Sequence, residues 1–351
     1  MAKVVMGIGT SHTPMNSMPV EYWGMHGELA DKGNKELVSV TSRTVKPYQA
    51  LEAEADPAIA RRLTTETFQA QYDRLQRAIE ATGRILREKN PDTVIIVSDD
   101  QDEMLFEDNM PSLMIYWGET MKLRPGSYTG GDPPPSVKAA MWGYGDQEME
   151  VPVDHELGKH LIEYLVEAEF DVAHSRYMQE RYGGSIGPAG YVWWKRETKP
   201  RAQGMPHGFA YIVKRVMDNN PIPILPVFQN TCYPPNQPTP RRSYALGKAI
   251  RAAIEDFSGD RRVCIIGSGG LSHFVLDEET DRMALNAMKN KDAEALCSIP
   301  RDRLLSASSE IQNWIAAAGA CEHLDFEIID YVPVVRTAAG TGGGWGFAHW
   351  K

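Results

Sequence analysis

Apolar and polar positions follow one another along the chain in blocks that predict buried strands ending in polar loops. Residues 94–97 (VIIV) form a short apolar and β-branched run, which is typical of a strand buried on both faces. The run stops at residues 98–103 (SDDQDE), which are too polar to continue into a core. The stop therefore marks the carboxyl end of a strand, and in open α/β sheets that end is where ligands bind.

Two further runs have the same pattern. Residues 3–8 predict a first buried strand, which ends in GTSHTP and brings His12 just beyond it. Residues 262–266 predict another buried strand, which ends in GSGGLSH and delivers His273. The glycines before His273 allow a tight turn and a close approach by other groups. Three predicted strand ends thus carry polar groups, and such ends converge on one crevice.

Helical periodicity fills much of the chain between the predicted strands. A cap at Thr64 or Thr65 and an apolar stripe predict a long helix over residues 63–89, which ends before Pro91. Shorter helices are predicted over residues 154–167, 208–217, 243–257, 281–296 and 306–318. Strands separated by helices indicate an α/β fold, which we expect to be a mixed central sheet flanked by helices.

Four segments fit the pattern less clearly. Residues 170–174 predict a short strand, and residues 222–228 predict a strand whose prolines suggest an edge or irregular position. Residues 182–206 are rich in loop-forming residues and are a candidate lid. The tail, residues 337–346, is dominated by glycine, and we expect it to fold over the site or over a partner subunit.

Composition narrows the class of protein. Of 351 residues, 42% are hydrophobic and 24% are charged, which is ordinary for a globular protein with a large core. The formal net charge of −10 and the lack of a basic run argue against nucleic-acid binding. The four cysteines form no CxxC pair, so we expect reduced thiols in a cytoplasmic protein. No apolar run approaches bilayer length, so we expect no membrane segment.

The motifs of several common enzyme classes are missing. No P-loop occurs, the GSG at residues 267–269 lacks the nucleophile-elbow pattern, and the GIG at residues 7–9 lacks the third glycine of the dinucleotide fingerprint. Histidine combined with carboxylate or amide groups instead suits a divalent metal such as Fe(II), Mn(II) or Zn(II). The strand-end residues therefore predict a metal site.

Six motifs in order along the chain resemble the class III, LigB-type extradiol ring-cleavage dioxygenases. They are GIGTSHTP, IIVSDDQDEMLFEDNMPSLMIYWG, PHGF, PPNQPTPRRSYALGKAIRAAIE, IIGSGGLSH and SEIQNWIAAAGA. The resemblance covers nearly the whole chain and is greatest to the gallate and 3-O-methylgallate dioxygenase branch. It implies one LigB-like α/β catalytic domain over residues 1–351, with an inserted irregular and helical segment over about residues 15–89.

The resemblance also implies roles for single residues. His12 and Glu310 match iron ligands of the family, and His273 matches its catalytic acid/base. His207 matches a histidine that contacts substrate or oxygen beside the metal.

The family's second ligand histidine falls on Gln101, and the sequence holds no histidine between His26 and His155. Three groups remain candidates for that ligand position. Gln101 comes first because it takes the register position, Glu103 comes second, and His26 is the third.

The activity that the resemblance implies is Fe(II)-dependent extradiol cleavage of a gallate-like or methoxylated catecholic acid with O2. The alternatives are ring cleavage of another vicinal oxygen chelate such as a hydroxypyridone, a metal-dependent hydrolase on the same scaffold, and a metal-free binding homologue. Arg241, Arg242 and Arg336 are candidate partners for a substrate carboxylate, and each is equally well explained as a solvated surface arginine. We expect a homodimer or larger homo-oligomer.

Overall fold

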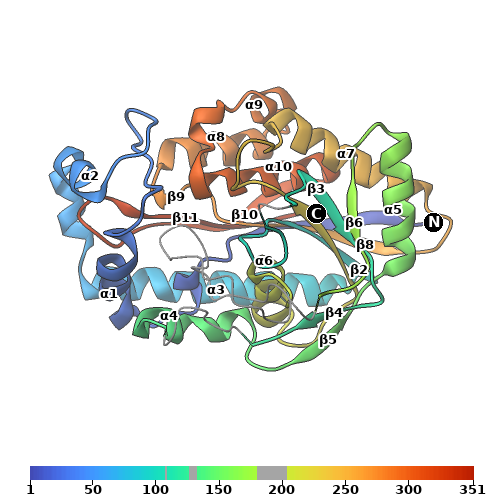
Figure 1. Cartoon of the computed structure of the whole chain (residues 1–351), viewed down its shortest axis with the longest axis horizontal. Helices are drawn as coiled ribbons and strands as arrows, with labels where there is room; N and C mark the ends of the chain where they lie inside the picture. Colours follow the sequence, from blue (N-terminus) through green and yellow to red (C-terminus); the bar gives the residue numbers. More distant parts are fainter. Residues whose placement is uncertain (107–108, 126–132, 180–203) are drawn as a thin grey trace.

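The computed structural model describes residues 1–106, 109–125, 133–179 and 204–351 (Figure 1). Within these residues, a mixed nine-stranded sheet has the order β10-β11-β1-β8-β2-β7-β3-β6, and β9 pairs with β11. Its strands are β1 (Lys3–Thr10), β2 (Thr93–Ser98), β3 (Leu113–Tyr116), β6 (Ala173–Ser175), β7 (Ile224–Gln229), β8 (Arg262–Ser268), β9 (His273–Val275), β10 (Phe326–Val335) and β11 (Thr341–Trp350). A separate two-stranded sheet pairs β4 (Thr120–Leu123) with β5 (Met149–Pro152).

Helices cover both faces of the large sheet, as the predicted α/β class requires (Figure 1). The long helix α3 lies with α4 and α6 on one side, and α7, α8, α9 and α10 lie on the other. The α-helices are α1 (Trp23–His26), α2 (Tyr48–Glu54), α3 (Thr65–Lys89), α4 (Pro135–Ala140), α5 (His155–Glu167), α6 (His207–Tyr211), α7 (Pro240–Asp256), α8 (Glu278–Lys289), α9 (Ala293–Cys297) and α10 (Ile311–Ala320). None of the helices in the described residues is long and apolar enough to cross a bilayer.

Short 3-10 and π-helical turns join these elements. The 3-10 turns are η1 (Pro14–Asn16), η2 (Val20–Tyr22), η4 (Pro57–Arg62), η5 (Met141–Tyr144), η7 (Arg301–Arg303) and η8 (Ser306–Glu310). The π-helices are η3 (Gly27–Asp31) and η6 (Ile212–Val216). Residues 208–217, predicted as one helix, are therefore α6 followed by a π-helix. Residues 281–296 are likewise two helices, because Lys291 between them has a positive φ of 53°.

The centre of the sheet is parallel. β1, β8, β2 and β7 run in the same direction, and the residues of β2 and β7 are all buried, as their apolar composition predicts. In register, Thr10 lies beside Ser268 and Ser98 lies beside Phe228. The carboxyl ends of these strands therefore share one edge of the sheet, and the loops that follow them meet there.

The prediction that β7 lies at an edge or is irregular is wrong. β7 pairs with β2 on one side and β3 on the other. The carbonyl of Ile224 accepts a hydrogen bond from the N–H of Asp154, so Ile224 and Pro226 face the β3 side, since hydrogen-bonding direction alternates along a strand. The registered pairing with β3 ends at Val227. Pro226 therefore lies just beyond the paired residues, where its missing N–H leaves no hydrogen bond of the sheet unmade.

Most of the glycine-rich tail belongs to the central sheet, and its Trp345 contributes to the wall of the pocket described below. Residues 341–350 form β11, an interior strand between β10 and β1. Its glycines have a packing role: a Cβ on Gly344 would lie 1.9 Å from the Asp281 carboxylate, and one on Gly342, which has a φ of +148°, would lie 2.0 Å from the Val334 carbonyl. The strand therefore needs glycine because its neighbours approach its backbone closely.

The segment inserted after β1 packs over one end of the sheet. α3 begins at the Thr64 cap, whose hydroxyl accepts the N–H of Thr67. Its buried side chains, among them Phe68 and Leu75, join a core cluster with Trp23 of the insertion and with residues of β10 and β11. The helix prediction for residues 63–89 is thus confirmed to within two residues. Residues 182–203 of the candidate lid lie outside the described residues.

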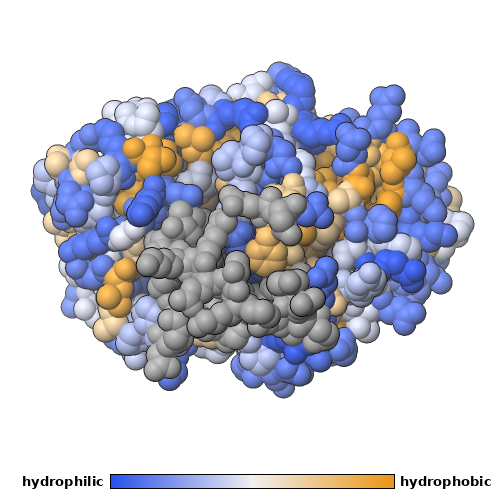
Figure 2. Space-filling view, in the orientation of Figure 1, coloured by the Kyte–Doolittle hydropathy of each residue, from blue (hydrophilic) through white to orange (hydrophobic). Residues whose placement is uncertain are grey.

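The visible face of the molecule is mostly hydrophilic, and hydrophobic residues gather there in separate patches (Figure 2). The formal charge of −10 agrees with such a surface. The predicted homo-oligomer stays a prediction.

Candidate metal centre

The five predicted site residues line one pocket. His12, Gln101, His207, His273 and Glu310 all contribute to its wall, although they come from distant parts of the chain. The pocket contains about 550 Å³ of empty space, including the part open to solvent. It lies at the shared strand edge, where the loops after β1, β2 and β8 meet the start of α6 and the residue before α10.

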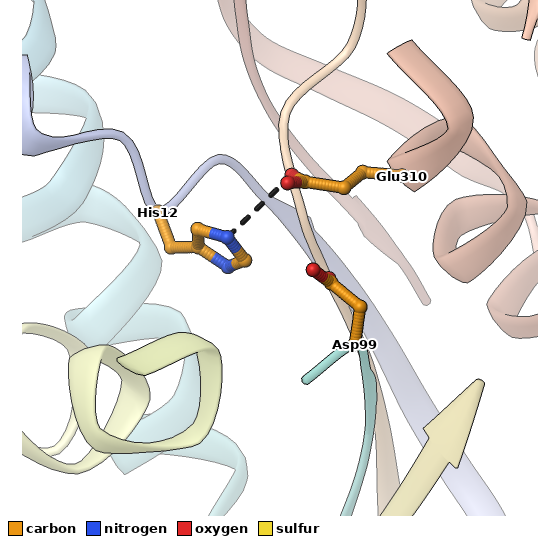
Figure 3. Close-up of side chains that lie close together, drawn as sticks. All are labelled: His12, Asp99 and Glu310. Carbon is orange, nitrogen blue, oxygen red and sulfur yellow. Dashed lines mark ion pairs between the residues drawn. The ribbon is translucent and has the colours of Figure 1, made fainter. Parts of the chain in front are cut away.

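Three potential metal ligands are close together here, and two of them, His12 and Glu310, line this pocket. Ligand atoms of His12, Asp99 and Glu310 all lie within 4.8 Å of one another, and all three residues are buried (Figure 3). The imidazole Nε2 of His12 is 3.5 Å from Oε2 of Glu310. Asp99 follows β2 directly, and its carboxylate points toward the same point from the other side (Figure 3).

The orientation of His12 is fixed by a hydrogen-bonded chain behind it. The Ser268 hydroxyl donates to the carbonyl of Gly208 at 2.7 Å, so its oxygen is left to accept from Nδ1–H of His12 at 3.0 Å. That tautomer leaves the Nε2 lone pair facing Glu310, and Nε2 makes no hydrogen bond within the described residues. A buried imidazole nitrogen without a hydrogen bond needs an explanation, and a metal ion is one.

A glycine allows α6 to approach this histidine. A Cβ on Gly208 would lie 2.2 Å from Oγ of Ser98 and 2.9 Å from Cε1 of His12. The imidazole rings of His12 and His207 consequently meet edge to face, with centroids 4.7 Å apart.

Glu310 sits at the junction between the 3-10 turn η8 and α10. Its carboxylate accepts the N–H of Gly270 at 2.6 Å and lies 3.2 Å from Nε2 of His273. Burial alone would raise the pKa of Glu310, but His273 and His12 hold it well below its ordinary value. Glu310 is therefore an anion at the centre of the site.

Gln101 lies between the two carboxylates. Its side-chain nitrogen is 3.0 Å from Oδ2 of Asp99 and 3.0 Å from Oε1 of Glu310. Asn313 donates to the other oxygen of Asp99 at 3.1 Å. Burial and the Glu310 carboxylate raise the pKa of Asp99, because two adjacent anions in a buried site repel each other. A divalent cation is the partner that such an arrangement would accept.

Glu103, the second candidate for the missing ligand, is hydrogen-bonded to His207. It accepts both the backbone N–H and Nδ1–H of His207. His26, the third candidate, lines the pocket, but its Nδ1 is 3.4 Å from the Ser136 hydroxyl. Neither residue belongs to the cluster of three ligand groups found in the described residues.

His273 faces Glu310 from the glycine turn after β8. Its Nδ1–H donates to the carbonyl of Leu271 at 2.8 Å, so Nε2 is the atom that faces the pocket. Residues 273–275 form β9, which pairs with β11 and holds the ring beside Trp345, with centroids 5.6 Å apart. Burial would lower the pKa of His273, but the Glu310 carboxylate raises it.

Of the three candidate arginines, Arg336 alone lines this pocket. Arg241 is exposed and pairs with Glu294, and Arg242 stacks on the ring of Phe170. Both agree with the surface interpretation of these two side chains.

Sequence reasoning identified the strand end at residues 99–103 but did not single out Asp99, Ser268 or Asn313. Asp99 could have been identified from the sequence, because it directly follows the buried strand. Ser268 and Asn313 have none, since each acts through a side chain more than 200 residues away.

The chain belongs to the LigB family. The family model described as "Catalytic LigB subunit of aromatic ring-opening dioxygenase" matches residues 57–341. This range contains Asp99, Gln101, His207, His273 and Glu310, and it begins after His12. The fold class expected from the resemblance is therefore confirmed.

Curated relatives match over shorter stretches. The chain is 32% identical over 133 residues to a 2,3-dihydroxyphenylpropionate/2,3-dihydroxicinnamic acid 1,2-dioxygenase of Photorhabdus laumondii, covering 38% of this chain and 32% of the relative. It is 36% identical over 81 residues to the gallate dioxygenase of Pseudomonas putida, covering 22% of this chain and 24% of the relative. It is 25% identical over 206 residues to the enzyme of Klebsiella pneumoniae that has the same name as the Photorhabdus relative, covering 58% of this chain and 51% of that relative. The chain thus spans between 24% and 51% of these relatives.

Proposed function

We propose that the chain is a non-haem Fe(II)-dependent extradiol dioxygenase that opens the ring of a gallate-like or methoxylated catecholic acid with O2. The observation that carries this proposal is the buried Nε2 of His12, which has no hydrogen-bond partner in the described residues and faces two carboxylates. Family membership supports the reaction class, and the gallate dioxygenase among the relatives supports the substrate class.

The metal would be held by His12, by Glu310 and by an oxygen from the end of β2. Asp99 offers a carboxylate oxygen there, and Gln101 offers its amide oxygen if the amide is rotated by half a turn. One imidazole with oxygen ligands suits Fe(II) or Mn(II) better than a thiolate-preferring metal. A bound ferrous ion would supply the Lewis acidity that ionises vicinal ring hydroxyls and a path by which electrons of the ring reach dioxygen.

His273 would carry the proton transfers. Its Nδ1 is fixed by the Leu271 carbonyl, so Nε2 is the position that takes a proton from a ring hydroxyl and returns it later. His207 would contribute a positive charge to the pocket wall. Burial alone would lower the pKa of His207, but Glu103 raises it to about 9, so the ring is cationic at neutral pH. A cation there would stabilise negative charge developing on substrate or oxygen.

Oxygen uptake by the Fe(II)-loaded protein tests the proposal. Gallate, 3-O-methylgallate and protocatechuate form the substrate panel, and an ester and an amide of the same acids test for hydrolysis. We expect uptake of one O2 per ring opened, and its loss in His273→Gln. Hydrolysis without oxygen uptake would show that the protein is a metal-dependent hydrolase. A hydroxypyridone is tested beside the acids, and uptake with this compound alone would show that the substrate is another vicinal oxygen chelate.

Three organisational features belong to the same proposal: one catalytic domain over residues 1–351, a homodimer or larger assembly, and a cytoplasmic location. All four cysteines are free in the structure, as a reducing compartment favours. Light scattering on the purified protein measures the assembly directly.

A further inference from the structure

Arg336 is a buried cation in the wall of the pocket. It follows β10 and is 6% exposed. Its Nε and Nη2 each donate to a different oxygen of Asp31 at 2.7 Å, which is a bidentate pair. The Thr341 hydroxyl donates to the same Asp31 carboxylate at 2.6 Å. The guanidinium is therefore held in one orientation by a carboxylate from the segment inserted after β1.

One end of this guanidinium has only a weak partner. Within the described residues, Nη1 of Arg336 donates to the thioether sulfur of Met15 at 3.2 Å. A thioether is a poor acceptor for a charged N–H, and Nη1 carries two such hydrogens. A carboxylate oxygen in the pocket would be a much stronger acceptor.

His26, which lies in the same pocket wall, carries no charge that would bind an anion in place of Arg336. Burial, and then the charge of Arg336, lower the pKa of His26 to about 4, so this ring is neutral at working pH. His26 and Arg336 both line the pocket that contains His12 and Glu310. The pocket thus has a cluster of metal-ligand groups in one part of its wall and a fixed guanidinium in another.

We propose that Arg336 anchors the carboxylate of the aromatic substrate, and that Asp31 is the positioning residue that holds Arg336 for this task. The inference rests on the proposed function, because it takes the substrate to be an aromatic acid whose ring lies between Arg336 and the metal-ligand cluster. Asp31 already neutralises one charge, so the anchor acts chiefly through directed hydrogen bonds. We therefore expect a preference for the acid of about 10- to 100-fold.

Binding without turnover tests the anchor separately from the dioxygenase. The probes are 3,5-dihydroxybenzoate and its neutral analogue 3,5-dihydroxybenzamide, neither of which has vicinal hydroxyls to chelate a metal. Calorimetric titration of the full chain should give tighter binding of the acid. Arg336→Met should reduce acid binding to the level of the amide and weaken amide binding much less, because the amide oxygen is an uncharged and weaker acceptor.

Two further variants make the result interpretable. Arg336→Met leaves Asp31 buried without its partner, so the double variant Arg336→Met with Asp31→Leu removes both charges and protects the fold. It should lose the preference for the acid to the same extent. Arg74→Gln is the matched control, because Arg74 pairs with Asp330 of β10 and is not part of the pocket wall.

Equal binding of the acid and the amide by the unsubstituted protein would overturn the anchor, as would full acid binding by the folded double variant. Either result leaves the dioxygenase proposal standing, since oxygen uptake is measured with different compounds. Conversely, loss of acid binding in the Arg336 variants without oxygen uptake by any variant would support the anchor and reject the dioxygenase.

Discussion

Nδ1 of His207 lies 2.9 Å from Oε1 of Glu103, and the same carboxylate accepts the backbone N–H of His207 at 3.1 Å. Glu103 thus fixes both the ring and the start of α6. This pairing explains why the most distal carboxylate of the acidic strand end is not among the clustered ligand groups.

Replacing Glu103 by Gln should lower the pKa of His207 from about 9, because burial is then opposed only by the charges of Asp99 and Glu310. A histidine with a raised pKa stabilises the fold below its unfolded-state pKa, and this contribution is lost as pH rises through about 9. Glu103→Gln should therefore also flatten the alkaline fall in stability. NMR titration of the ring measures the pKa, with Glu148→Gln as an exposed control. An unchanged His207 titration would contradict the assignment.

Metal retention should depend more on Asp99 than on Gln101. Asp99→Ala removes a carboxylate from the cluster of three ligand groups, and we expect at least a 10-fold loss of Fe(II) or Mn(II) affinity. Gln101→His adds an imidazole at the position where the resemblance implies a ligand histidine, and it should increase retention. Metal content after dialysis measures both, with Asp325→Ala as an exposed control.

The opposite order of effects would identify the ligand differently. If Gln101→Ala loses the metal and Asp99→Ala keeps it, the amide of Gln101 is the ligand that the sequence first predicted. Unchanged iron content in both variants would remove the end of β2 from the metal's coordination.

Ser268→Ala should weaken metal binding by about 10- to 100-fold without unfolding the protein, because it removes the acceptor that fixes the tautomer of His12. Ser243→Ala, which changes another buried serine on α7, is the matched control. Calorimetric titration with Mn(II) measures the affinity in the absence of turnover. Equal affinities of the Ser268 and Ser243 variants would exclude a role for the hydroxyl.

His26 should make the protein sensitive to acid. Its pKa is lowered to about 4 in the folded state by burial and by Arg336, whereas the unfolded chain titrates near 6.5. The unfolded state therefore binds more protons between these values, and stability should fall by about 3 kcal/mol as pH drops from 6.5 to 4. His26→Gln should remove this part of the acid limb in denaturant unfolding. A parallel loss in both proteins would mean that other groups cause it.

The buried strands and the place of the site could be predicted because both depend on local pattern. The apolar run at residues 94–97 and the polar run after it predict a strand and its end without any knowledge of neighbours. The three histidines of the predicted site were found because each has a motif of its own. All of them line one pocket, together with Gln101 and Glu310.

What could not be predicted depends on contacts between distant residues. Pro226 suggests an edge strand until the pairing of β7 with β3 is seen to end at Val227. The glycines of β11 do not indicate an interior strand until Asp281 and Val334 are found against them. In the same way, nothing near Arg336 in the sequence distinguishes it from a surface arginine, because its partner Asp31 is about 300 residues away.

The interior position of β11 has a consequence for how the site comes into being. β11 joins β1, through pairs such as Gly7 with Trp350, and it also holds β9, through the pair of Gly343 with His273. His273 is therefore fixed opposite Glu310 by the same strand that closes the sheet against β1. During synthesis, a chain that ended before β11 would carry every ligand residue and still lack its acid–base geometry, so catalytic competence is expected to arise late, once β11 has paired with β9.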